Sequence, residues 1–575
     1  MDENNSVLDI YEKTGYFIFL FVGITILITS TLLLCNITVG IYNLLAGYFI
    51  TWISVYYIFY RKRYKKFILV GILATCVIIM AVVLNTYIQE IAYDGNLYHK
   101  FAVGLLKMGW NPIYDNIYEY IKILGIPDNR ISSSDIWVAC YPKAAWYFDS
   151  SIYALTNNIE SAKVFNFLIL YGTLAINYHF FSKKLRTTLA IIISLAMVMI
   201  PAGCSQIFTF YVDGALGALL VTSAIILISL SEDQDLNKRK IDFLCLAICI
   251  VVCSNLKITG LAFEAILCGV FFVYWCILIK KKCWENKGRI YKWLIYYTLV
   301  VIITVGIVGF GTYICNIRDF GNPLYPMFGS DILNVNNSLK NVDLDKSSPL
   351  IQILSMIFVR TSNSDNIPTL EWKIPFTFEI SEFYKCGQDT IRGGAGVLFS
   401  GILCVSLIML LYFILNEYKN IKKEYIPVFL VITYAFIMLC VMPAGGQTRY
   451  SPYIYYIPYF TLYIWMRDIE LNVSLHKRSS RKYKAEMLIG IVMTVLIFIN
   501  ASAFFEYSIR GIIESRKYQE QYEKMKVAKI VLIDTPLPGL VFNFIDQNIT
   551  YEYQTNVELK DGKMEYLFLT YQLYK

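Results

Sequence analysis

Long apolar runs recur along almost the whole chain, and they constrain the fold more than any other feature of the sequence. Each run has about 14 to 24 residues, close to the roughly 20 that an α-helix needs to cross a bilayer. Composition agrees, since 57% of the 575 residues are hydrophobic, 16% are charged and the mean hydropathy is +0.51. The chain is therefore expected to be an α-helical polytopic membrane protein.

Thirteen segments have the length and apolar character of a transmembrane helix. They cover residues 16–35, 39–60, 67–87, 161–181, 187–203, 208–230, 241–254, 258–279, 293–315, 393–416, 425–442, 450–467 and 485–506. Only Asn255-Leu256-Lys257 separates the seventh segment from the eighth. These two segments are therefore either separate spans or one bent span with a re-entrant piece.

Basic residues cluster in alternate loops between these segments. The clusters lie at residues 61–66, 183–186, 238–240, 280–282, 422–423 and 477–482. Because basic loops stay in the cytoplasm, the N-terminus is expected there, with the C-terminus outside the cell membrane. This topology also accounts for the net charge of +8, so no nucleic-acid partner is expected.

The same topology predicts how the chain divides. Residues 1–506 would form the transmembrane domain, with large outer loops at 88–160 and 316–392. Residues 507–575 would form a small extracytoplasmic αβ module, with strands near 528–533, 550–553 and 566–571.

The loop at 88–160 carries the first candidate site residues. Asp94 follows the third apolar segment closely, so its carboxylate is either a solvated loop group or a general base held in a cleft. Tyr98 and Trp110 offer rings on which a sugar can stack, and His99 either supports Asp94 or is structural. The stretch 98–106 is amphipathic, which is typical of a helix lying on a membrane surface.

A second group lies at the outer end of the sixth segment and comprises Gln206, Tyr211 and Asp213. An acid in apolar surroundings is costly, which indicates a functional or paired role for Asp213. The alternative is a helix-packing network in which Gly214 and Gly217 allow close approach.

Three cations, Lys143, Lys257 and Arg449, lie near membrane level on the expected outer side. Positive charge there runs against the usual bias. These side chains either snorkel to lipid headgroups or bind an anionic group such as a lipid phosphate.

Cofactor signals are weak. The histidines are scattered and the cysteines lack metal-ligand spacing, so neither a metal site nor a cofactor is predicted, although a divalent metal is not excluded. The sequence also lacks a glycine-rich phosphate loop. An activated group would therefore have to arrive through the membrane, as it does on a lipid carrier.

An ordered set of short motifs runs from about residue 85 to residue 465. They lie at 94–99, 110–112, 141–143, 154–156, 211–214, 257–261, 322–326, 393–394 and 449–450. With these motifs the chain resembles the bacterial GT-C superfamily of membrane glycosyltransferases, which use polyprenyl-phosphate-linked sugars. The family carries its catalytic acid in the first large outer loop, which corresponds here to Asp94.

The resemblance implies a GT-C-like bundle and a sugar transfer at the outer face of the cytoplasmic membrane. Asp94 would deprotonate an acceptor hydroxyl, while Lys257 and Arg449 would stabilise the departing polyprenyl phosphate. The acceptor would be a cell-envelope glycan, a lipid or a protein, and membrane lipids would surround the enzyme. Gly95 stands where some branches carry a second acid, which favours a metal-independent mechanism.

Two other functions fit a chain of this kind. An O-antigen-type polysaccharide polymerase would depend on arginines in the outer loops and little on Asp94. A transporter or flippase for lipid-linked glycans would show pseudo-repeats and broken helices near the membrane midplane.

Overall fold

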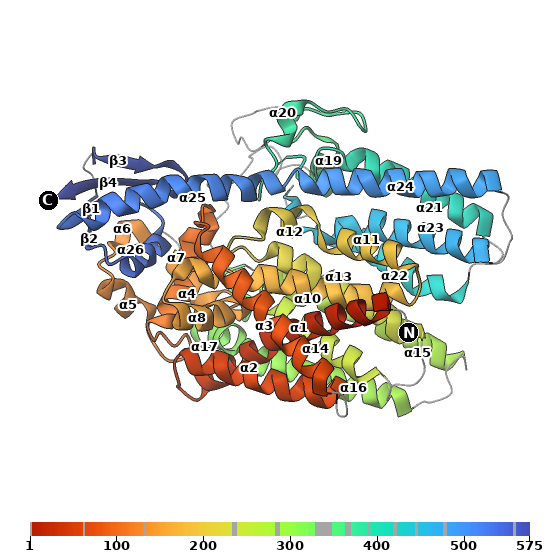
Figure 1. The fold of residues 1–575 in the computed structure, drawn as a ribbon, viewed down its shortest axis with the longest axis horizontal. Helices are drawn as coiled ribbons and strands as arrows, with labels where there is room; N and C mark the ends of the chain where they lie inside the picture. Colours follow the sequence, from red (N-terminus) through yellow and green to blue (C-terminus); the bar gives the residue numbers. More distant parts are fainter. Residues whose placement is uncertain are drawn as a thin grey trace.

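The protein is described by a computed structural model. The described residues are 3–60, 64–131, 134–232, 239–281, 288–327, 348–362, 370–388, 390, 392–417, 422–442, 447–474, 480–555 and 559–574. They form a bundle of long helices that carries a small sheet at one end (Figure 1). This end is called the sheet end below.

Ten helices of the described part are long and apolar enough to cross a membrane. They comprise α1 (Glu3–Leu34), α2 (Ile41–Val55), α3 (Tyr64–Thr86), α10 (Phe165–Ser182), α13 (Asp213–Glu232), α15 (Ile258–Lys280), α16 (Gly288–Val301), α21 (Phe399–Glu417), α22 (Ile426–Val441) and α24 (Ser480–Ser502). The predicted multi-pass helical fold is therefore confirmed.

The other three predicted spans are also helical, but they fall short of that criterion in the described residues. Helix α11 (Thr187–Val198) stops early because Pro201 starts a separate short helix, α12 (Pro201–Gln206). Helix α14 (Lys240–Ser254) has 15 residues and is distinct from α15, so residues 241–279 form two helices. Helix α23 (Tyr456–Ser474) carries Arg467, Asp468 and Glu470 in its last two turns.

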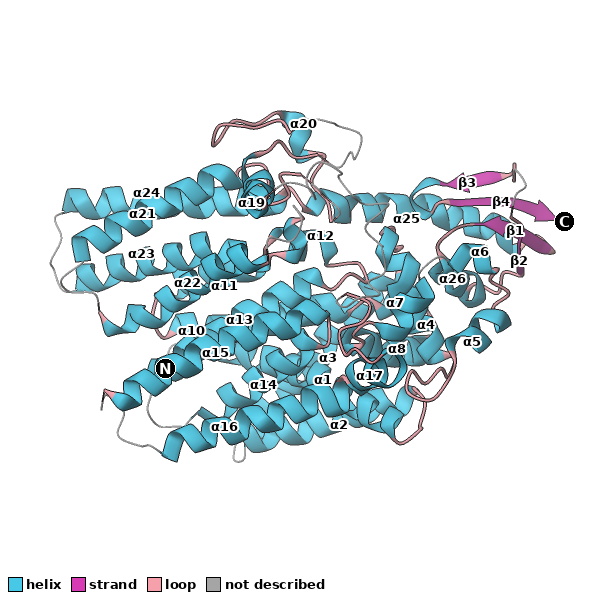
Figure 2. Cartoon of the chain, turned by 180° about the vertical axis from the view of Figure 1, so that it is seen from behind, coloured by secondary structure: helices cyan, strands magenta, loops and turns pink. Residues whose placement is uncertain are grey.

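The loop between α3 and α10 folds into short helices at the sheet end (Figure 2). These are α4 (Lys100–Lys107), α5 (Ile117–Ile123), α6 (Asp128–Ile131), α7 (Ser134–Cys140), α8 (Ala144–Thr156) and α9 (Ile159–Ala162). The expectation that residues 98–106 lie on a membrane surface is wrong. All residues of α4 from Lys100 to Leu106 are buried, because α8 and the C-terminal residues cover them.

The C-terminal residues continue the last spanning helix beyond the bundle. Helix α25 (Phe505–Lys526) follows α24 almost without a break and leads into the sheet (Figure 1). The strands are β1 (Ile530–Asp534), β2 (Tyr551–Tyr553), β3 (Gly562–Met564) and β4 (Leu569–Tyr574), in the order β2-β1-β4-β3. Strand β1 pairs parallel with β2 and antiparallel with β4. Alternation along β1 turns Val531 and Ile533 into the core.

The sheet and the short helix α26 (Val541–Asp546) pack directly on the first loop. Gly104 of α4 permits this packing, because a Cβ there would lie 2.1 Å from the ring of Phe542. Asp546 accepts hydrogen bonds from the Tyr153 hydroxyl at 2.5 Å and from the Ile159 amide at 2.6 Å. The end of the chain thus closes over the loop that follows α3.

The connection between α16 and α21 also reaches the sheet end. It contains α17 (Cys315–Phe320), α19 (Pro349–Phe358) and α20 (Ile380–Phe383). Asn316 donates to the Cys140 carbonyl at 3.0 Å, and Arg318 donates to the Ile113 carbonyl at 2.9 Å. The first predicted large loop, the start of the second and the C-terminal residues therefore lie at one end of the bundle.

Candidate functional site

Four of the predicted charged residues come together at the sheet end, each from the end of a long helix. Asp94 follows α3, and Asp213 is the first residue of α13. Lys257 directly precedes α15, and Arg449 lies in the 3₁₀ turn Thr448–Tyr450 before α23. The end of one long helix and the starts of three others thus bring two acids and two cations to one place.

Arg449 holds Asp94 from across the site. Its Nη2 lies 3.3 Å from Oδ2 of Asp94 and donates to the Tyr450 hydroxyl at 2.6 Å. The guanidinium carbon lies 5.1 Å from the centre of the Tyr211 ring and 4.7 Å from that of Tyr450, within range of cation–π attraction. The Asp94 side chain is 23% exposed and that of Arg449 is 8% exposed, so the carboxylate is accessible while the guanidinium is nearly buried.

Lys257 and Asp213 form the second ion pair of the site. The side-chain amide of Gln206 donates a hydrogen bond to Oδ2 of Asp213 at 3.0 Å. Its oxygen accepts a hydrogen bond from the Gly214 amide at 2.8 Å. The Lys257 ammonium also lies 4.3 Å from the centre of the Tyr450 ring. Tyr450 therefore stands between the two cations.

Asn166 of α10 fixes the loop that carries Tyr211, a role that the sequence analysis missed. Its side-chain nitrogen donates to the carbonyls of Gln206, Thr209 and Tyr211 at 2.6–2.9 Å. The Tyr211 hydroxyl accepts from the Asp94 amide at 3.3 Å. At Gly214 a Cβ would lie 2.7 Å from Gly203, so the glycine allows close packing beside the charged site.

His99 borders the four charges as a neutral, buried ring. Its Nδ1 accepts from Nε1 of Trp146 at 2.8 Å, so the ring proton of the neutral form is on Nε2. Burial, reinforced by the positive charge of Lys257, lowers the pKa of His99 to about 3. Among the described residues Nε2 has no hydrogen-bond partner although it is buried. Tyr98 packs on the same ring with 4.3 Å between ring centres.

Two predicted site residues are not in contact with this group. Lys143 is buried and donates to the carbonyls of Ala139 and Tyr141 at 2.7 Å and of Gly311 at 3.1 Å. Burial lowers the pKa of its ammonium to about 8. Trp110 is 1% exposed and lies beyond the far end of α4.

A small, partly open cavity of about 10 Å³, roughly enough for one water molecule, reaches Arg449 from between helices. Its wall includes Pro201 and Ala202 of α12, Gly394 of the loop before α21, and Phe504 between α24 and α25. Arg449, whose guanidinium pairs with Asp94, lines this cavity.

Glu90 is a further acid that the sequence analysis missed. Its side chain is fully buried, and it joins the two loops that carry the site. One carboxylate oxygen accepts from the Ala92 amide at 2.7 Å and the other from the Phe210 amide at 2.6 Å. Burial raises the pKa of Glu90 to about 7. Ala92 lies two residues before Asp94, and Phe210 directly precedes Tyr211. The Glu90 carboxylate therefore connects the backbone segment that carries Asp94 with the one that carries Tyr211.

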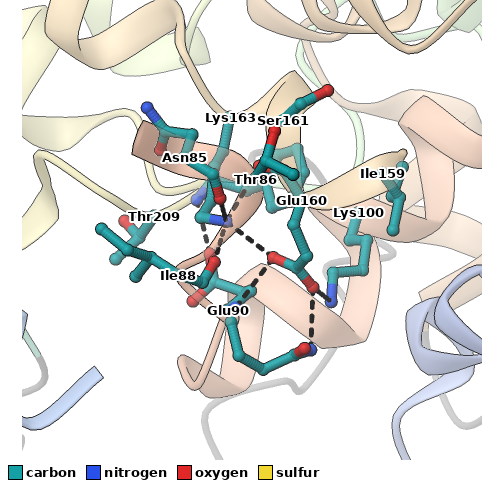
Figure 3. Close-up of polar contacts among 12 residues, drawn as sticks. Asn85, Thr86, Ile88, Glu90, Lys100, Ile159, Glu160, Ser161, Lys163 and Thr209 are labelled. Atoms are coloured by element: carbon teal, nitrogen blue, oxygen red, sulfur yellow. Dashed lines mark hydrogen bonds and ion pairs between the residues drawn. The ribbon is translucent and has the colours of Figure 1, made fainter. Parts of the chain in front are cut away.

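Beside Glu90, the carboxylate of Glu160 organises a buried network (Figure 3). It pairs with Lys100 at 2.6 Å and with Lys163 at 2.7 Å, and it accepts from the Glu90 amide at 2.9 Å. Asn543 of α26 donates to the same carboxylate at 2.8 Å. Lys163 in turn donates to the carbonyls of Asn85 and Ile88, beside the end of α3. The network therefore fixes the loop start, the span before it and the C-terminal residues to one another.

The arrangement suits acid–base chemistry on an anionic substrate. The accessible carboxylate of Asp94 is placed to accept a proton, and the two cations provide positive charge on either side of Tyr450. Within the described ranges, no three His, Cys, Asp or Glu side chains group as candidate metal ligands.

The fold and the site define a multi-pass membrane protein with a charged site at one end of its helical bundle. No family model matches the sequence, and no curated protein matches it. Among solved structures, the crystal structure of ArnT from Cupriavidus metallidurans bound to undecaprenyl phosphate is similar over 85% of this chain and 86% of that chain. The TM-score is 0.43 at 9% sequence identity, which is too weak a similarity to assign an activity.

Proposed function

We propose that the chain is a membrane glycosyltransferase of the GT-C type. It would transfer a sugar from a polyprenyl-phosphate-linked donor to a cell-envelope acceptor at the outer face of the cytoplasmic membrane. The observation that carries the proposal is the pairing of the accessible Asp94 carboxylate with Arg449 at 3.3 Å, beside the Lys257–Asp213 pair. The sheet end would face outward, with the N-terminus in the cytoplasm.

In the proposed reaction Asp94 removes the proton of an acceptor hydroxyl as the oxygen attacks the anomeric carbon. The bond between this carbon and the phosphate oxygen breaks, and the electron pair leaves with the polyprenyl phosphate. Asp94 loses one negative charge while the phosphate gains one. The total charge around Arg449 is therefore unchanged, and the guanidinium can exchange its carboxylate partner for the leaving phosphate.

Other residues of the site would bind and orient the substrates. The Nε2–H group of His99 offers a buried donor for a sugar or phosphate oxygen. Asp213 and Gln206 would hold the Lys257 ammonium in place. Tyr98 and Tyr211 would shield the site from water, and the phosphate end of the donor would lie beside the small cavity at Arg449.

The test is an assay of the purified protein with a panel of polyprenyl-phosphate sugars, following release of polyprenyl phosphate. Asp94→Asn is expected to lower kcat by about 10²- to 10⁴-fold, the usual contribution of a general base. Asp319→Asn is the matched control, because this exposed acid pairs with its neighbour Arg318. Wild-type turnover by Asp94→Asn would refute the assignment.

A further inference from the structure

A row of exposed apolar side chains lies on the connection between α16 and α21. Trp372, Ile374, Phe376, Phe378 and Ile380 alternate along this stretch, and all of them are exposed. Ile374 and Ile380 are each 73% exposed, as much as the most exposed side chains of the spanning helices. Residues 348–362 and 370–385, which contain this row, are called the flank segment here.

The flank segment lies beside spanning helices and not above them. Phe376 adopts a positive φ of 66°, which is strained for a bulky residue. Its ring packs on Gly401, where a Cβ would lie 2.4 Å away. Gly401 belongs to the first turn of α21 and lies within the apolar span Phe399–Asn416. The exposed row therefore lies at the same depth as the first turn of α21, where the apolar span begins.

Two other contacts place the segment at the same level. Helix α19 packs against both α21 and α22. Cys386 and Phe383 pack with Ala501 and Phe504 around the last turn of α24. In Figure 1, α19 and α20 accordingly lie along the side of the bundle, next to α24.

Most charges of the flank segment are neutralised within it. Arg360 pairs with Glu379 at 2.8 Å and with Glu382 at 3.5 Å. Lys373, buried beneath the exposed row, pairs with Glu382 at 3.0 Å. With Glu371 and Lys385, the described residues of the segment carry equal numbers of acidic and basic groups. Such internal pairing suits a low-dielectric boundary, where an unpaired charge would be costly.

We propose that the flank segment is embedded in the lipid leaflet at the sheet end, with its row of apolar side chains in contact with acyl chains. The proposal is independent of the sugar-transfer activity. It also changes the expectation for residues 316–392, because part of this connection would be a membrane-immersed wall instead of an aqueous loop. The segment continues through Gly387 and Gln388, which line the cavity at Arg449, so lipid would lie next to that cavity.

The experiment uses the wild-type protein in vesicles containing phosphatidylcholine with a diazirine halfway along one acyl chain. After illumination, lipid adducts are mapped by peptide mass spectrometry. Peptides covering 372–380 are expected to label as strongly as the peptide with Leu411 and Leu415 of α21. They should label roughly tenfold more than peptides with Val527 or Ile123, since apolar faces at an interface sink about 5–10 Å into the boundary.

Val527 and Ile123 are matched controls because they are 84% and 71% exposed, yet lie on the sheet and first-loop side. Labelling of 372–380 at the level of these controls would overturn the proposal. A second outcome would also overturn the proposal: no lipid labels on 372–380, together with cross-links between the flank segments of two copies. That result would assign the exposed row to an interface between copies.

Discussion

Asp213 and Lys257 form an ion pair that joins the first turn of α13 to the residue before α15, across 44 positions of sequence. The Asp213 side chain is 2% exposed and that of Lys257 is 10% exposed. Because both side chains are buried, each charge is stable in this environment only when the opposite charge is present.

The first prediction concerns this pair. Asp213→Asn leaves the Lys257 ammonium buried beside a neutral amide, which is expected to cost about 3–5 kcal/mol of stability. The double variant Asp213→Asn with Lys257→Met removes both charges and is expected to regain most of that loss without regaining activity. Thermal unfolding in detergent micelles measures the difference. Equal stability of the single and double variants would contradict the pairing.

The second prediction concerns the geometry of Arg449. A lysine cannot reproduce a planar guanidinium that contacts both Asp94 and the Tyr450 hydroxyl. Arg449→Lys is therefore expected to lower kcat/KM for the donor by about 10²-fold, as for the loss of one oriented donor to a developing charge. Initial rates at varied donor concentration provide the measurement.

Arg318→Lys serves as its control, since Arg318 is exposed and pairs with Asp319. A large effect of this control with little effect at Arg449 would favour the polymerase alternative over the proposed transferase.

The third prediction is a pH dependence of stability. The pKa of His99 is lowered to about 3, whereas an unfolded histidine titrates near 6.5. Between these values the unfolded state binds a proton that the folded state does not, so stability falls as the pH drops. His99 alone is expected to contribute up to about 1.4 kcal/mol per pH unit to this loss. His99→Gln should unfold with a shallower acid dependence, and unchanged slopes in wild type and variant would disprove it.

The fourth prediction tests Glu90 as a positioning residue. Glu90→Gln turns an amide group toward one of the two backbone N–H donors, from Ala92 or Phe210, and so loses one hydrogen bond. A hydrogen bond to a charged group contributes about 1.5–3 kcal/mol, so kcat is expected to fall by about tenfold or more while KM changes little. The exposed Glu119 gives the control Glu119→Gln. A rise in KM with normal kcat would instead place Glu90 in substrate binding.

The sequence was sufficient to place the four charged site residues at the same side of the membrane. Each stands where an apolar run begins or ends, so hydropathy places it near the membrane boundary, and the alternation of spans puts all of them at the same end. The structure then brings Asp94 to Arg449 and Asp213 to Lys257. Whether these residues act as proposed stays a prediction.

The parts that the sequence did not predict depend on tertiary packing. In the sequence pattern Glu90 and Glu160 do not differ from other loop acids. They become buried among backbone amides and two lysines only when the chain folds. Lys143 has the expected charge, but its ammonium is used to bind carbonyls. The helix at Lys100–Lys107 has an amphipathic pattern, but the protein buries it from Lys100 to Leu106. Periodicity alone cannot distinguish an apolar face that packs against protein from one that packs against lipid.

The contact between Asn543 and Glu160 also orders events during synthesis. Lys100 and Glu160 are synthesised before their partner Asn543 of α26, which follows Glu160 by 383 positions in the sequence. Until then the first loop lacks both its polar partner and the cover of Phe542. A chain that lacks α26 would therefore leave this charge network open to water.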